Sequence, residues 1–455
     1  MIGAAAVATP STPTTMTIIG IMAAVLVAQT IVLVGSGWLR SRAILGPEAS
    51  RKCAHIGSGL IALPLPWLFD RVWPVFLLCG IGFCALLALR ATTSLRRVDL
   101  LRATARGLHD VERPSLGDLL FPVAVATLFW LAHATPVLYA LPLLALALAD
   151  AAAALIGRRH PIGRYATAES HKSLAGSAAF AATTFALIVL PLVLFVPLDL
   201  PRATLIALSA AILLSIVEAI SFRGLDNLLV PLLGYAILAV ELTLPMPSLL
   251  LRCAVAVTLL VALLRIRPAG AMLPDAVAAL ALFLYAVWAI GGPAWLAPAG
   301  LATMIVVLAF RAAARAKEDA HIAPRGAPVV VAMTLASLVW MVLAATVAST
   351  ERHDSTAFAG ALAMATAMLV STALASRWRA ALAGLPPLTI AWMTLPTMAH
   401  SPVAVGAAGA CAIAAGIWPI DLADERLRWA VRSLLILAAS IIMAFMPSLI
   451  GPSHA

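Results

Sequence analysis

TMTIIGIMAAVLVAQTIVLVGSGWL, from Thr15 to Leu39, is an apolar run without a single charged residue. A helix needs roughly 17 to 25 such residues to cross the hydrocarbon core of a bilayer. The residues before this run contain no lysine or arginine, and the run is longer than the core of a signal peptide. We therefore expect a retained first transmembrane helix.

Similar runs recur along the whole chain. Of its 455 residues, 63% are hydrophobic and only 11% are charged, against about 25% charged in globular proteins. No soluble core could bury so much apolar surface, and we expect an all-α, polytopic integral membrane protein with about sixteen transmembrane helices. The expected spans of the first half, after Thr15 to Leu39, are Val72 to Leu89, Gly117 to Ala134, Pro136 to Ala154, Ser173 to Val196, Ala203 to Ser221 and Leu228 to Met246, with Gly57 to Phe69 as a tilted or partial helix.

Cysteines and net charge exclude several classes. The five cysteines are scattered and odd in number, which suggests neither a disulfide framework nor a zinc site. The net charge of +10 reflects basic loops beside a lipid bilayer, so no nucleic-acid partner is expected.

Basic residues set the orientation. They gather after the first, third and fifth expected helices, within Arg40 to Lys52, Arg90 to Arg113 and Arg158 to Lys172. If the helices alternate in direction, these three clusters lie on one side, which the positive-inside rule makes cytoplasmic. We expect a cell membrane of the bacterial inner-membrane type, with the active site on its cytoplasmic face.

The loops divide the chain in two. Before about residue 246 they are rich in acids, bases, glycines and hydroxyls, whereas the later loops are short with simple basic flanks. We therefore predict a catalytic membrane domain over residues 1–246 and a helical membrane domain of unknown role over residues 247–455.

Asp150 is the most informative residue. It lies inside an apolar run, where an ionisable group costs roughly 2.5 to 3.5 kcal/mol at a helix centre and is functional by default. Gly157 follows seven residues later on the same helical face, where a missing side chain would let a ligand approach. The alternative is that Asp150 only pairs with a nearby arginine for structural reasons.

The next helix begins after Lys172 and Ser173. The positive end of a helix dipole and its free backbone N–H groups bind phosphate readily, and a lysine adds charge. Gly176 and the hydroxyl of Ser177 follow within one turn. The spacing is not that of a P-loop, and a simple helix cap remains the alternative.

Two further acids are expected at the same depth as Asp150. Glu218 ends the seventh expected helix, and Asp226 with Asn227 opens the eighth. Three carboxylates beside a basic loop provide the oxygen ligands and positive charge that a magnesium nucleotide needs. Asp226 could also be an ordinary N-cap.

A basic segment precedes the second expected helix. It holds Arg51, Lys52 and His55, and the last two share a helical face. Lys52 and Lys172 are two of only three lysines in the chain, which favours a specific requirement for lysine at both positions. His55 alone could equally be a structural hydrogen-bonding residue.

Together these segments resemble the polyprenol kinase family, which includes dolichol kinases, phytol kinases and CTP-dependent diacylglycerol kinases, with phosphatidate cytidylyltransferases as distant relatives. The resemblance covers about the first 240 residues and departs from the family pattern at His160-Pro161. It rests on these motifs: Arg51-Lys52-x-x-His55, Glu112-x-x-x-x-Gly117 with Phe121-Pro122, Asp150-x-x-Ala153-x-x-x-Gly157, Lys172-Ser173-x-x-Gly176-Ser177, Glu218-Ala219 and Asp226-Asn227-x-x-Val230-Pro231.

The resemblance implies a membrane transferase that moves the γ-phosphate of CTP, with Mg²⁺, to the hydroxyl of a membrane isoprenoid alcohol. Asp150, Glu218 and Asp226 would then hold the metal or position the hydroxyl. Lys172 is the fourth expected catalytic residue. The residues expected to bind nucleotide and phosphate are Arg51, Lys52, His55, Gly157, Arg158, Ser173, Gly176, Ser177 and Asn227.

Two rival functions remain open at this point. A phosphatidate cytidylyltransferase would use the same nucleotide but attack its α-phosphate. A membrane transporter would fit the number of expected helices, although transporters place polar groups near the bilayer midplane, whereas the charged groups here gather at one surface.

Overall fold

The computed structural model describes residues 15–92, 115–265, 272–315, 326–331, 334, 337 and 338. The described chain falls into two compact units. The first holds residues 15–92, 115–159, 178–214 and 223–244, and the second holds residues 160–177, 215–222 and the described residues from 245 onward. Glu112 of the family motif and most of the second half lie outside the described residues.

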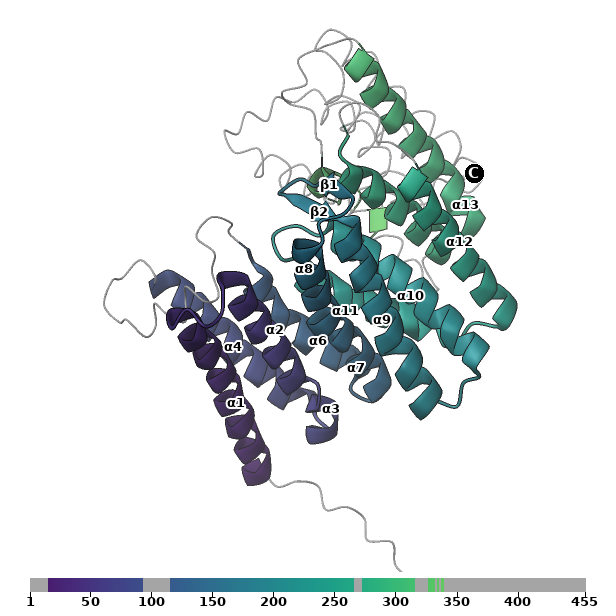
Figure 1. The fold of residues 1–455 in the computed structure, drawn as a ribbon. Helices are drawn as coiled ribbons and strands as arrows, with labels where there is room; N and C mark the ends of the chain where they lie inside the picture. Colours follow the sequence, from purple (N-terminus) through teal and green to yellow (C-terminus); the bar gives the residue numbers. More distant parts are fainter. Residues whose placement is uncertain are drawn as a thin grey trace, which may run out of the picture. The chain divides into compact units, whose positions relative to one another are not determined.

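The first unit begins with helices that pack as neighbours (Figure 1). They are α1 (Thr15–Ser41), α2 (Pro47–Ala62), the single turn α3 (Leu65–Leu68), α4 (Val72–Thr92) and α6 (Gly117–Ala132). Helix α2 begins at a proline because an N1 residue needs no N–H partner. It therefore starts well before the expected partial helix at Gly57, and Arg51, Lys52 and His55 lie within it, not before it.

One long apolar span carries Asp150. It consists of α7 (Pro136–Leu144), a π-helical turn η1 (Ala145–Ala149) and α8 (Asp150–Arg159). The turn follows Pro142, whose ring removes one backbone donor from α7 and disturbs the regular bond ladder. Single π turns of this kind occur frequently at functional sites.

A small hairpin interrupts the helical order. Strands β1 (Arg164–Ala166) and β2 (His171–Ser173) are antiparallel, with Tyr165 opposite Lys172. Within the residues that the structure describes, the expected all-α architecture is confirmed apart from this hairpin. Lys172 and Ser173 lie in β2, directly before the next helix.

The remaining helices are α9 (Leu174–Phe195), α10 (Leu200–Ile220), α11 (Asp226–Glu241), α12 (Met246–Arg265) and α13 (Pro274–Arg315), the last with a kink at Gly292. Of these spans α10 is the most enclosed, since 78% of its most apolar stretch is buried. Glu218 lies in its last turn, as predicted. Asp226 is the first residue of α11, after an N-cap at Leu225, so the N-cap alternative for Asp226 is wrong.

The core of the first unit lies between α2, α4, α6 and α7. Leu128, Phe129 and Tyr139 are fully buried there, and the Tyr139 hydroxyl donates to the Ala62 carbonyl at 2.9 Å. This packing fixes α2 against the span that carries Asp150.

Seven helices of the described chain are long and apolar enough to cross a membrane. Two shorter apolar helices, over Gly117–Ala132 and Trp295–Leu308, accompany them. These spans make the chain an integral membrane protein. The expected count of about sixteen helices is not confirmed, and many of those helices fall outside the described residues.

Candidate active site

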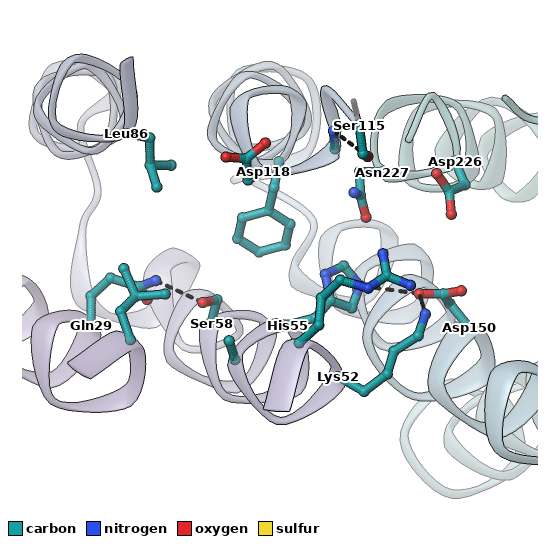
Figure 2. Close-up of a pocket in the computed structure, with 15 residues that line it drawn as sticks. Gln29, Lys52, His55, Ser58, Leu86, Ser115, Asp118, Asp150, Asp226 and Asn227 are labelled. Atoms are coloured by element: carbon teal, nitrogen blue, oxygen red, sulfur yellow. Dashed lines mark hydrogen bonds and ion pairs between the residues drawn. The ribbon is translucent and has the colours of Figure 1, made fainter. Parts of the chain in front are cut away.

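An ion pair joins α2 to α8. The Lys52 ammonium lies 2.5 Å from Oδ2 of Asp150, and both residues are buried (Figure 2). A buried carboxylate needs such a partner, because removing a charge from water is costly. Asp150 therefore has a cationic partner, as an intramembrane acid requires, and this partner is a lysine, whereas the structural alternative named an arginine.

His55 lies one turn after Lys52 on α2. Its Nε2 is 3.3 Å from the Leu146 carbonyl and 3.7 Å from Oδ2 of Asp150. A carbonyl oxygen can only accept, so Nε2 carries the proton in this contact. The imidazole also meets the Phe121 ring edge-on at 5.7 Å between centroids. His55 thus ties the π turn, which contains Leu146, to α2.

Asp226 and Asn227 are positioned by a close backbone contact. The N–H of Leu116 donates to the Arg223 carbonyl at 2.8 Å, which joins the start of α6 to the turn before α11. At Gly117 a Cβ atom would lie 2.2 Å from Nδ2 of Asn227. Gly224, at φ +83°, would carry a Cβ only 2.4 Å from the Gly117 nitrogen. The backbone contact and the positive φ require glycine at Gly224, whereas a side chain at Gly117 would displace the Asn227 amide.

These elements enclose one cavity of about 110 Å³. Pockets that enclose a drug-sized ligand are roughly 300 to 1,000 Å³, so this cavity suits the end of a larger molecule. Six polar residues named above as candidates line it: Arg51, Lys52, His55, Asp150, Asp226 and Asn227.

The other end of the cavity is less polar. Leu86 of α4 lies there with Gln29 and Ser58, and the cavity lining also includes the apolar Leu33 of α1 and Phe121 of α6. In Figure 2, Gln29 and Leu86 lie at the end of the view opposite Asp150 and Asp226. Gln29 donates to Ser58 at 2.6 Å, so its amide is already engaged. The cavity thus joins a charged end to an end where apolar side chains lie beside the paired polar groups of Gln29 and Ser58.

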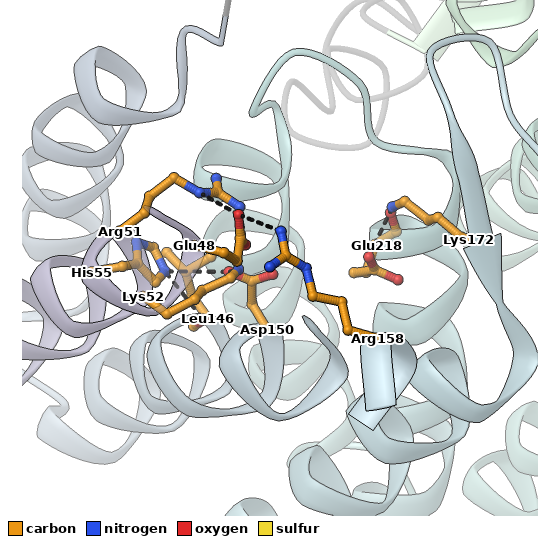
Figure 3. Close-up of polar contacts among 9 residues, drawn as sticks. All are labelled: Glu48, Arg51, Lys52, His55, Leu146, Asp150, Arg158, Lys172 and Glu218. Carbon is orange, nitrogen blue, oxygen red and sulfur yellow. Dashed lines mark hydrogen bonds and ion pairs between the residues drawn. The ribbon is translucent and has the colours of Figure 1, made fainter. Parts of the chain in front are cut away.

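Glu48 was not expected from the sequence. Its carboxylate lies 2.5 Å from Arg51 on the same helix and 3.2 Å from Arg158 of α8 (Figure 3). Burial by itself raises the pKa of Glu48, but the hydrogen bond and charge of Arg51 outweigh it, and the pKa lies below its usual value. The only sequence signal was the i,i+3 spacing from Glu48 to Arg51.

A second pair outside the expected set involves α4 and α6. Arg90 forms an ion pair with Asp118 and donates to the Ser115 carbonyl. Asp118 and Ser115 both line the cavity. Arg90 therefore fixes the segment that leads into the Gly117 contact.

In the second unit the hairpin holds the end of α10. The Lys172 ammonium lies 2.8 Å from Oε1 of Glu218 and also donates to the Glu218 carbonyl (Figure 3). Tyr165, opposite Lys172, lies 2.9 Å from the Ser177 hydroxyl. Burial and the negative charge of Glu218 raise the pKa of Tyr165, so the phenol stays protonated.

The first turn of α9 differs from the expectation of free N–H groups. The N–H groups of Leu174 and Ala175 donate to the carbonyls of Gly163 and Ile162, and that of Gly176 donates to the Ser173 hydroxyl at 3.1 Å. The chain folds back at Gly163, which has a φ of +66°. The prediction of free N–H groups at the start of α9 is therefore wrong, and Ser173 caps the helix.

The expected magnesium site can be tested against these donors. Within the described ranges, no three His, Cys, Asp or Glu side chains gather closely enough to hold a metal ion, and Glu218 is engaged by Lys172. Asp150 and Asp226, however, line the same cavity as Asn227, whose buried Oδ1 has no hydrogen-bond partner. Mg²⁺ binds one or two carboxylates plus phosphate oxygens, so these three oxygen donors fit it in kind.

Gly157 lies half-buried in α8, two turns beyond Asp150, and Arg158 follows it beside Glu48. The first unit therefore brings together Arg51, Lys52, His55, Asp150, Arg158, Asp226 and Asn227, and the second unit brings together Lys172, Ser173, Gly176, Ser177 and Glu218.

Comparison with known proteins identifies a relative. The chain is 31% identical over 207 residues to a phytol kinase of Synechocystis sp., a match that covers 44% of this chain and 82% of the relative. No protein-family model and no solved structure matches the chain. The match supports the relationship that the motifs in the first part of the chain predicted. Through this part, the chain belongs to the polyprenol kinase family, in which phytol kinases are included.

Proposed function

We propose that this protein transfers the γ-phosphate of CTP to the hydroxyl of a membrane isoprenoid alcohol, at the cytoplasmic face of a bacterial-type inner membrane. Membership of the family and the relative named as a phytol kinase support phosphate transfer to an alcohol. The single observation that carries the proposal is the cavity in which Asp150, paired with Lys52, lies beside Asp226 and Asn227.

The charged end of this cavity suits phosphoryl transfer. Phosphoryl transfer requires mainly positioning and charge neutralisation. Asp150, Asp226 and the Oδ1 atom of Asn227 would hold Mg²⁺, which would supply positive charge to the phosphates. Lys52 and Arg51 hold positive charge at the same end, and Glu48 fixes the direction of Arg51.

The apolar end suits the acceptor. A lipid alcohol has one polar atom at the end of a long carbon chain, and a small cavity can enclose that end while the chain remains outside. Leu33, Leu86 and Phe121 would contact the first carbons of the chain. The hydroxyl would then face Asp150 and His55.

The hairpin of the second unit is the second group that we propose to act on the nucleotide. Because the first N–H groups of α9 are engaged, we assign phosphate contact to the side chains of Lys172 and Ser177 and to the positive end of the α9 dipole. Glu218 orients Lys172 in this proposal, and its expected role as a metal ligand stays a prediction.

Labelled nucleotide tests the proposal. Purified full-length protein is incubated with Mg²⁺ and CTP that is labelled either in the γ-phosphate or in the cytosine, with phytol, polyprenol, diacylglycerol or phosphatidate as acceptor. We expect γ-phosphate label in phytol or polyprenol. Cytosine label in a product from phosphatidate would instead establish a cytidylyltransferase, and absence of label from every lipid would contradict both enzymes.

A further inference from the structure

A carboxylate from the second half of the chain holds the turn of the hairpin. Asp275, in the first turn of α13, accepts a hydrogen bond from the Ala168 backbone N–H at 2.8 Å. Only 3% of Asp275 is exposed. Ala168 lies in the four-residue turn between β1 and β2, and Asp275 lies 107 residues further along the chain.

A second contact comes from the same half. At Gly326 a Cβ atom would lie 2.5 Å from Cβ of Ala168, so only glycine allows this approach. The turn is also closed internally, because Thr167 donates from its N–H to the Ser170 carbonyl at 2.8 Å. The hairpin turn is therefore held in one position by Asp275 and Gly326, and both lie beyond residue 246.

The pairing of the two strands fixes Lys172 relative to the turn. Ala166 pairs with His171, and Tyr165 pairs with Lys172, within two residues of the turn on each strand. A short two-stranded hairpin is marginally stable by itself and needs packing against other elements. Loss of the Asp275 contact would leave the Ala168 N–H without its partner and free the turn to move.

We propose that Asp275 is a positioning residue for the nucleotide-binding hairpin, and hence that the second half of the chain completes the enzyme. This inference rests on the proposed function in one respect, namely that the ligand of Lys172 is a nucleotide. The contact between Asp275 and the turn is independent of that function. It gives a role to at least part of residues 247–455, most of which the match to the phytol kinase leaves uncovered.

The test uses the full-length protein with Asp275→Ala, Asp275→Asn and the control Thr258→Ala. Thr258 lies on the exposed face of α12, where its hydroxyl donates to the Ala254 carbonyl of its own helix. Asparagine keeps an oxygen that can accept from the Ala168 N–H, whereas alanine removes it. Backbone hydrogen exchange of the hairpin is measured first, without any ligand.

We expect faster exchange of the Ala168 region in Asp275→Ala, with exchange near that of the unchanged protein in Asp275→Asn and Thr258→Ala. Unchanged exchange in Asp275→Ala would overturn the inference. Because this measurement uses no substrate, its outcome stands even if the protein does not use CTP.

Kinetics provide the second measurement. We expect the KM for CTP to rise about tenfold in Asp275→Ala, as for the loss of one buried hydrogen bond, with kcat and the KM for the alcohol nearly unchanged. Asp275→Asn should restore most of the loss. An equal fall of kcat and protein yield in both variants, without a change in the KM for CTP, would show a general structural role and overturn positioning of the hairpin.

Discussion

The Lys52 ammonium and the Asp150 carboxylate lie 2.5 Å apart, although 98 residues separate them in the chain. Each side chain comes from a different helix, and the pair forms part of the cavity wall. The two charges hold α2 against α8, and they also present one carboxylate to whatever enters the cavity. These two roles can be separated by experiment.

Asp150→Asn is expected to lower phosphate transfer by at least about 100-fold, because an amide cannot replace the charge of the carboxylate. Lys52→Met should lose about 3 to 5 kcal/mol of stability, since it leaves a buried carboxylate unpaired. The double variant should regain thermal stability, because it buries no charge at this position. It should remain inactive in the assay with γ-labelled CTP, and recovery of activity would mean that Asp150 only supports the structure.

Gly117→Ala is expected to displace Asn227, because the new methyl group would meet its amide at 2.2 Å. Activity should fall at least tenfold, with a loss of about 1 to 3 kcal/mol in stability from overpacking. Gly80→Ala in α4 is the matched control, since no atom lies within 4 Å of the new Cβ there. The two variants are compared by thermal unfolding in detergent and by phosphate transfer, and equal behaviour would contradict the tight contact.

The two ends of α9 should face opposite sides of the membrane. In a cysteine-free background, Glu169→Cys should react with an impermeant thiol reagent from the cytoplasmic side, because basic residues flank the hairpin. Asp199→Cys should react only from the other side. Asp70→Cys, between α3 and α4, is the control for the outer side. Labelling of Glu169→Cys from outside would reverse the proposed orientation.

The Glu48 pair should give the protein an acid-sensitive contribution to stability. The pKa of Glu48 is lower in the folded protein than in the unfolded chain, so the contribution is complete above the unfolded value and disappears as the pH falls through the folded value. Thermal unfolding between pH 6 and about 3.5 should show this loss. Glu48→Gln should remove that part of the pH dependence of stability, while the other carboxylates still contribute theirs. An unchanged dependence of thermal stability on pH in this variant would contradict the role of Glu48.

The sequence predicted the elements better than their contacts. Apolar length located the spans, and helix ends placed Asp150, Asp226 and Asn227 at one level. Neither length nor spacing could pair Lys52 with Asp150, because that contact depends on how α2 packs against a distant span. The sequence indicated only that Asp150 needs a metal or another cation as its partner, with a nearby arginine as the structural alternative.

Local backbone geometry was the second feature that the sequence did not predict. The sequence around Lys172 indicated a helix start with free N–H groups, but the chain folds back at Gly163 and its carbonyls take those groups. No local sequence pattern distinguished a helix start with free N–H groups from one whose N–H groups are engaged. Asp275 was missed because its partner is a backbone N–H in a turn more than 100 residues earlier.

The π-helical turn at Ala145–Ala149 sets the rotational phase of Asp150. A π turn accommodates one residue more than an α turn, and each residue of an α-helix advances the side-chain direction by about 100°. If the same residues formed a continuous α-helix, the direction of Asp150 relative to Tyr139 would rotate by about 100°, whereas deletion of one of the five residues would restore α-helical geometry with both directions kept. The span between Pro136 and Arg159 therefore directs its carboxylate through this one wide turn, and a change of backbone geometry there would act on catalysis without altering any polar group.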